Sequence, residues 1–74
     1  LRLTEDSWIE VFDAFENKVF VGLGHDGQVI YLKGTAPFSM LLGFAEGVSV
    51  EFNGERFDIL PYTKRSVAQF NLGE

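Results

Sequence analysis

Hydrophobic and polar residues alternate over several short stretches of the chain, which is the pattern of β-strands with one buried face. Residues 48–52 read Val-Ser-Val-Glu-Phe, and residues 68–72 read Ala-Gln-Phe-Asn-Leu. Asn53-Gly54 follows the first stretch, and Phe57 and Ile59 then resume its alternation. Because Asn and Gly both accept positive φ, this dipeptide predicts a type I′ turn and therefore a β-hairpin.

A second hairpin is predicted around His25-Asp26-Gly27, where turn residues separate two apolar stretches. Residues 19–23 read Val-Phe-Val-Gly-Leu, and residues 28–33 read Gln-Val-Ile-Tyr-Leu-Lys. We expect these two stretches to pair with each other across the turn.

Two stretches fit a helix as well as a strand. Apolar residues recur at helical spacing from Trp8 to Phe15, but residues 8–12 also alternate. Residues 37–45 show helical spacing too, and Pro37 suits a first helical turn, but Gly43 falls inside that stretch. We predict strands in both places. The expected fold is therefore all-β, a small antiparallel β-sandwich of about seven short strands built from hairpins.

Composition limits the classes of protein to consider. With 74 residues, the chain is expected to form one domain, 1–74, and its start at Leu1 suggests a fragment of a longer protein. A hydrophobic content of 46% is too high for a disordered segment, yet no apolar run approaches the ~20 residues of a membrane span. The net charge of −5 argues against nucleic-acid binding, because a nucleic-acid binder needs a basic face.

The candidate catalytic and metal-binding residues all have simpler structural interpretations. The chain has no cysteine, which excludes disulfides, thiolate zinc sites and cysteine nucleophiles. Residues 22–27 match G-x-G-x-x-G, but an apolar strand-like stretch follows instead of the helix that a dinucleotide site requires. His25 is the single histidine, and no G-x-S-x-G motif accompanies it. We expect no enzymatic activity, no cofactor and no metal.

The order of several motifs resembles the C-terminal extracytoplasmic domain of the RodZ family of bacterial cell-shape proteins. In chain order these motifs are Ser7-Trp8, residues 11–13, Gly22-Leu23, Gly27, residues 34–38, Leu42-Gly43, Val48, Val50, Asn53-Gly54, Val67-Ala68 and Phe70. Two departures stand out. Residues 14–17 replace the glycine-containing turn common after the first strand, and Phe44 stands where a small polar residue is common.

The resemblance implies an all-β domain of two packed sheets without catalytic residues. It also implies parts that this chain does not carry: a cytoplasmic helix-turn-helix domain, one membrane helix and a linker. In such proteins the cytoplasmic part contacts the actin-like protein MreB, and the outer domain is expected to engage the cell-elongation and peptidoglycan-synthesis machinery. We therefore expect a non-enzymatic interaction module, tethered on the extracytoplasmic side of the bacterial cytoplasmic membrane. The alternative is a module that binds the peptidoglycan glycan directly through an exposed Trp or Tyr.

Strand phase suggests where a partner binds. If residues 9 and 11 point into the core, Trp8 and Phe12 point away from it. If residues 19, 21 and 23 also point into the core, Phe20 joins them on the outer face. We expect Trp8, Phe12 and Phe20 to form the partner-binding surface, because exposed aromatic patches mark interaction sites. The alternative is that the phase is reversed, or that the ends of the chain fold over these rings and make them a second layer of the core.

Overall fold

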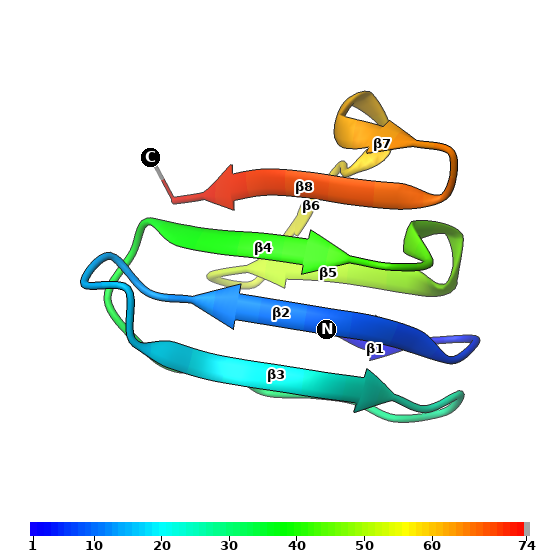
Figure 1. Ribbon diagram of the computed structural model, residues 1–74, viewed down its shortest axis with the longest axis horizontal. Helices are drawn as coiled ribbons and strands as arrows, with labels where there is room; N and C mark the ends of the chain where they lie inside the picture. Colours follow the sequence, from blue (N-terminus) through cyan, green and yellow to red (C-terminus); the bar gives the residue numbers. More distant parts are fainter. Residues whose placement is uncertain (74) are drawn as a thin grey trace.

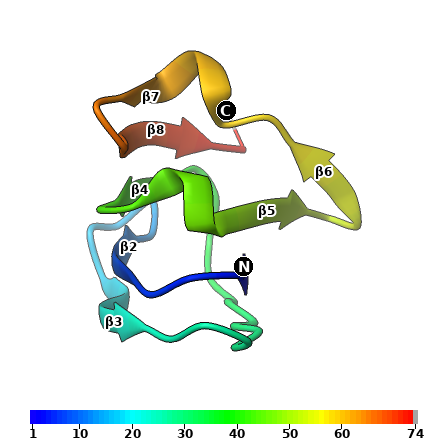
Figure 2. The ribbon, with the colours of Figure 1, turned by 90° about the vertical axis from the view of Figure 1, so that its right-hand side faces the viewer.

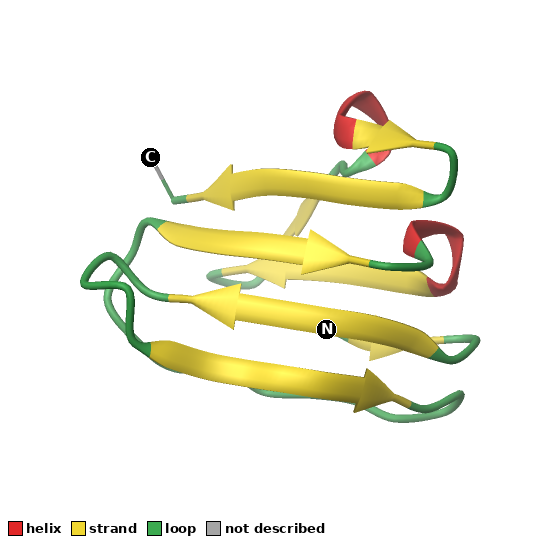
Figure 3. Ribbon diagram, in the orientation of Figure 1, coloured by secondary structure: helices red, strands yellow, loops and turns green. Residues whose placement is uncertain are grey.

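A computed structural model describes residues 1–73, and over this range the chain forms eight β-strands, two 3-10 turns and no α-helix (Figure 3). The larger sheet has five strands in the order β3-β2-β4-β8-β7. Its members, in that order, are Lys18–Gly24, Ser7–Phe12, Phe38–Leu42, Val67–Leu72 and Thr63–Lys64. The smaller sheet has the order β1-β5-β6, formed by Arg2–Leu3, Val48–Phe52 and Glu55–Phe57. Neighbouring strands are antiparallel in both sheets.

The two sheets pack face to face around a core, which confirms the predicted all-β sandwich (Figures 1 and 2). In Figure 1 the larger sheet lies in front of β1 and β5, and Figure 2 shows the two layers from the side. Both sheets supply buried hydrophobic residues, which are Leu3, Ile9, Val11, Ile30, Phe38, Met40, Leu42, Ala45, Val48, Val50, Ala68, Phe70 and Leu72. Residues 1–73 contain eight strands rather than about seven because two-residue strands such as β1 and β7 leave little pattern in a sequence.

The two stretches that fitted both a helix and a strand are strands. β2 lies between β3 and β4, so its backbone groups are paired on both sides. Along β2, Ile9 and Val11 are fully buried whereas Trp8 is 45% exposed. Every second residue of β4 is likewise buried. The 3-10 turn Ala45–Gly47 (η1) follows β4 and leads directly into β5.

The hairpin predicted at Asn53-Gly54 is confirmed. Phe52 lies opposite Glu55, and the two residues between them have φ of 53° and 80°, as a type I′ turn requires. The alternation ends earlier than predicted, because β6 stops at Phe57 and Ile59 has the αR conformation before the 3-10 turn Leu60–Tyr62 (η2). Ile59 nevertheless packs against the core.

The second predicted hairpin is wrong. Within residues 1–73, β3 pairs with β2 alone, and residues 28–30 run beside β1 instead. The Leu3 N–H donates to the Gln28 carbonyl over 3.0 Å, and the Ile30 N–H donates to the Leu1 carbonyl over 2.7 Å. Residues 28–30 therefore extend the smaller sheet rather than the larger one.

The turn that precedes this segment explains why no hairpin forms. The Gln28 N–H donates to the His25 carbonyl over 2.9 Å, so residues 25–28 form a β-turn. Gly27 has φ of 83°, whereas Asp26 is not among the residues with positive φ. A positive φ at the second central position alone is typical of a type II turn. Such a turn splays the flanking strands, so the chain crosses to the other sheet.

Candidate functional site

The outer face of the larger sheet carries the largest side chains that β2 presents to solvent. Ile9 and Val11 point into the core, so Trp8, Glu10 and Phe12 point the other way. Trp8 is 45% exposed, and Glu10 and Phe12 are half-buried. The structure therefore brings Trp8 and Phe12 to one face, as the strand phase predicted.

Neighbouring strands extend this face with apolar side chains that the sequence analysis did not select. Leu23 of β3 lies opposite Trp8 and is 49% exposed, and Val21 lies opposite Glu10 and is 40% exposed. On the other side of β2, Leu41 of β4 also lies opposite Glu10. We call the set of Trp8, Phe12, Val21, Leu23 and Leu41 the outer-face patch. Its members surround the Glu10 carboxylate.

The predicted position of Phe20 is wrong. Phe20 lies opposite the fully buried Val11, so it shares the inner face of the sheet and packs against the core. The expectation placed Val21 and Leu23 inside, but both are exposed. From Phe20 to Gly24 the phase of β3 is therefore the reverse of the predicted one, whereas Val19 packs against the core as predicted.

Two glycines explain this reversal. Gly22 and Gly24 occupy the inner positions of β3 after Phe20. A Cβ at Gly24 would lie 2.5 Å from Leu3 Cδ2 and 2.8 Å from Ile9 Cδ1, closer than real carbon atoms approach. The inner surface beside Gly24 is filled by side chains from other strands and leaves no room there for one from β3. Two glycines two positions apart in an apolar stretch are the sequence signal that identifies this face.

Glu10 gives the outer-face patch a polar centre. The Trp8 indole Nε1 donates a hydrogen bond to Glu10 Oε2 over 2.9 Å, which fixes the indole along its own strand. Beside Leu41, a shallow depression of about 220 Å³ is bordered by Glu10, Phe12, Gln69 and Asn71. Apolar surface around a carboxylate, with amide groups at one margin, suits recognition of another molecule better than catalysis.

The other candidate residues do not assemble into a catalytic or metal-binding arrangement within residues 1–73. His25 lies in the exposed turn, where its Nδ1 is 3.9 Å from Asp6 Oδ2. The G-x-G-x-x-G match spans the end of β3 and this turn, and extended chain rather than a helix comes directly after it. Among the described residues, no group of three or more His, Cys, Asp or Glu side chains is placed to hold a metal ion. The lack of enzymatic and metal-dependent activity stays a prediction.

Comparison with known proteins agrees with the motifs noted in the sequence. None of the helical segments in residues 1–73 has the length and hydrophobicity of a membrane span. No solved structure matches the chain. The family model described as the RodZ C-terminal domain matches residues 1–71, nearly the whole sequence. The chain therefore belongs to the RodZ C-terminal domain family.

Proposed function

We propose that this domain is a non-enzymatic interaction module of a RodZ-like cell-shape protein, and that it binds a protein of the cell-elongation and peptidoglycan-synthesis machinery through the outer-face patch. The proposal places the domain on the extracytoplasmic side of the bacterial cytoplasmic membrane, tethered by a membrane helix outside this chain. Family membership supports the cell-shape role. One observation supports the surface: Trp8 and Leu23 lie side by side, 45% and 49% exposed, on a sheet face.

The patch favours a protein partner of a particular chemistry. Large contiguous patches of exposed apolar side chains are uncommon on monomeric proteins and mark interaction sites, and Trp is a frequent anchor of interfaces. The Glu10 carboxylate retains acceptor capacity beyond its bond to the Trp8 indole. A partner surface with apolar side chains around a Lys or Arg would complement this arrangement.

Photo-crosslinking in living cells tests this proposal in the complete membrane-tethered protein. A photoreactive amino acid is placed at Val21, which is exposed on the patch, and crosslinked proteins are identified by mass. We expect crosslinks to a component of the peptidoglycan-synthesis machinery. Trp8→Ala should reduce their yield by roughly tenfold or more, as expected for an interface anchor.

Leu60→Ala supplies the matched control. Leu60 is 75% exposed and apolar, but it lies in η2, outside the outer-face patch. This substitution should leave the crosslinks from Val21 unchanged. Equal yields for Trp8→Ala and Leu60→Ala would contradict the proposal, as would crosslinks that arise only from a probe at position 60.

Direct binding of peptidoglycan glycan is the second candidate function. The observation that favours it is the exposed indole of Trp8 beside the hydrogen-bonding groups of Glu10, Gln69 and Asn71. Trp8 is the one tryptophan in the sequence, so its fluorescence reports on this face alone. A saturable change on titration with soluble muropeptides would favour the glycan, and no change would favour the protein partner.

A further inference from the structure

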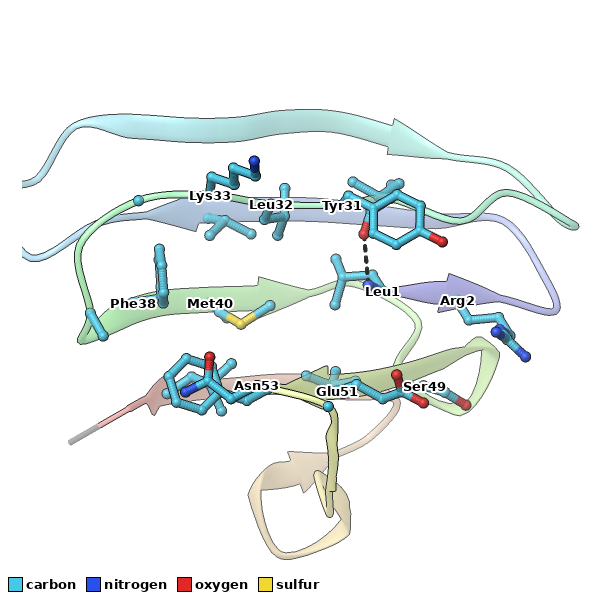
Figure 4. Close-up of a pocket in the computed structure, with 18 of the residues that line it drawn as sticks. Leu1, Arg2, Tyr31, Leu32, Lys33, Phe38, Met40, Ser49, Glu51 and Asn53 are labelled. Atoms are coloured by element: carbon cyan, nitrogen blue, oxygen red, sulfur yellow. Dashed lines mark hydrogen bonds between the residues drawn. The ribbon is translucent and has the colours of Figure 1, made fainter.

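An open groove of about 930 Å³ lies on the opposite side of the molecule from the outer-face patch, between β5 and residues 29–34. Apolar side chains of the larger sheet, including Val11, Phe38 and Met40, contribute to its lining. In Figure 4, Leu1 lies between Tyr31 on one side and Glu51 on the other. Beyond Leu1, the two sides continue as Lys33 and Asn53, and Phe38 and Met40 appear between them.

The groove continues the line of β1. Leu1 exchanges two backbone hydrogen bonds with Ile30, of 2.8 and 2.7 Å, and Arg2 pairs with Ser49 of β5. β1 is therefore an antiparallel strand held between β5 and residues 28–30. β1 occupies one end of the space between these two segments. The groove is the unoccupied remainder of that space.

Unpaired backbone groups line both sides of the groove. In antiparallel strands, the backbone groups of successive residues point alternately to the two neighbours. Arg2 points toward Ser49, so Glu51, two residues further along β5, also directs its N–H and C=O into the groove. On the other side, residues 31–33 make no backbone hydrogen bond to any described residue. Both sides thus offer the groups that bind a β-strand.

We propose that the groove is the binding site of one more strand segment, contiguous with β1 and formed by the residues directly upstream of Leu1 in a longer chain. The first upstream residue would exchange hydrogen bonds with Glu51 and point its side chain to solvent. The second would exchange hydrogen bonds with Leu32. Its side chain would point inward between Leu32 and Phe52, which are both partly buried against the core. An apolar residue therefore suits this second position.

A contiguous strand fits better than a separate peptide for two reasons. The Leu1 nitrogen already donates to the Ile30 carbonyl, and an amide at the same atom keeps that bond. A chain leaving Leu1 in the direction of β1 enters the groove in register, and its tethering replaces a bimolecular association. The groove lies on the opposite face from the outer-face patch. The test of this inference is therefore independent of the test of the proposed function.

Two extended forms of the 74-residue chain test the proposal. One carries Thr-Val-Thr ahead of Leu1, which places Val at the inward second position. The matched control carries Thr-Asp-Thr, which differs only in placing a carboxylate there. We expect the Thr-Val-Thr form to melt about 4 °C or more above the control. We also expect the Glu51 and Leu32 amide protons to exchange at least tenfold more slowly in it.

Three results would overturn the proposal. Equal melting temperatures and equal exchange rates for the two forms would show that no strand docks. Concentration-dependent dimerisation of the unextended chain, with protection of the Glu51 amide, would assign the groove to a second copy. Equal protection by free acetyl-Thr-Val-Thr-amide would assign it to a separate peptide.

Discussion

Trp8 and Leu23 lie directly opposite each other on β2 and β3, and both side chains point away from the core. Cross-strand pairs of an aromatic and an aliphatic residue contribute roughly 0.2–1 kcal/mol each. The pair therefore adds a small amount to stability while leaving a large apolar area in contact with water. A residue can be replaced at such a position without loss of the fold, which makes its role in binding measurable.

Trp8→Ala should lower the free energy of unfolding by about 1 kcal/mol, which corresponds to a fall of about 4–8 °C in melting temperature. Ile9→Ala is the matched comparison, because Ile9 is the next residue along the strand and is fully buried. That change should cost about 2–5 kcal/mol. Thermal unfolding followed by circular dichroism measures both. Equal losses would show that Trp8 belongs to the core.

Gly24→Ala should destabilise the domain by about 1–3 kcal/mol, because the added methyl group overlaps the side chains of Leu3 and Ile9. Gly22→Ala is its control on the same face of the same strand. The nearest atom to a Cβ there is Phe20 Cε1 at 3.9 Å, an ordinary contact. Gly22→Ala should therefore have little effect or raise the melting temperature slightly. If the two substitutions have the same effect, the close approach of Leu3 to Gly24 is not present in solution.

Arg65→Asn should raise the free energy of unfolding by about 0.5 kcal/mol. Arg65 and Ser66 connect β7 to β8 with φ of 53° and 71°, which is the conformation of a type I′ turn. Asn adopts positive φ more readily than Arg. Lys64→Asn removes the same charge from the adjacent strand position and should give no increase. Denaturant unfolding compares the two variants, and an equal response would attribute the effect to charge.

Asp13 should make stability depend on pH in the acid range. The backbone N–H of Asn17, 2.9 Å from Asp13 Oδ1, lowers the pKa of this carboxyl, and the Phe15 N–H acts in the same direction. Because the pKa of Asp13 is lower in the folded state than in the unfolded chain, the ionised carboxylate stabilises the fold. This stabilisation is complete at pH values above the ordinary pKa range of a carboxyl group. It is lost as the pH falls through the folded-state pKa, below about 3.9.

Melting curves measured between about pH 7 and pH 2 test this assignment. Asp13→Asn should melt below the parent chain near neutral pH, and the two curves should converge in acid. Asp26→Asn is the control, because the Asp26 side chain accepts no hydrogen bond from any described residue. A constant difference between Asp13→Asn and the parent at every pH would assign the effect to something other than the Asp13 charge.

Much of the fold follows from local pattern. β5 and β8 each have one buried and one solvent face, so alternation alone predicted them. The turn at Asn53-Gly54 was predictable because both residues accept its backbone conformation. Residues 28–33 were expected to pair with β3, whereas residues 28–30 join the smaller sheet, because the type of turn at Gly27 decides between a hairpin and a crossover. A glycine at position 27 is compatible with a hairpin turn and with a crossover turn.

The candidate surface was predictable only in part. Ile9 and Val11 fix the direction of their neighbours Trp8 and Phe12, and this information is local. The direction of Phe20 depends instead on Leu3, a residue from a distant part of the chain that fills the space beside Gly24. Val21 resembles a core residue in the local pattern, although it is 40% exposed. Contacts between strands far apart in the sequence decide such a case.

The position of β1 in the smaller sheet has a consequence for how the chain folds. β2 and β3 are joined by the five residues 13–17, whereas Thr4 meets Gly47, 43 positions away. Closing the longer loop costs about 2 kcal/mol more in chain entropy than closing the shorter one. We therefore expect the β2–β3 hairpin to form early and β1 to join late, after β4 and β5 have met. By the same reasoning, the contact of β1 with β5 should open more readily than the β2–β3 hairpin when the native state fluctuates.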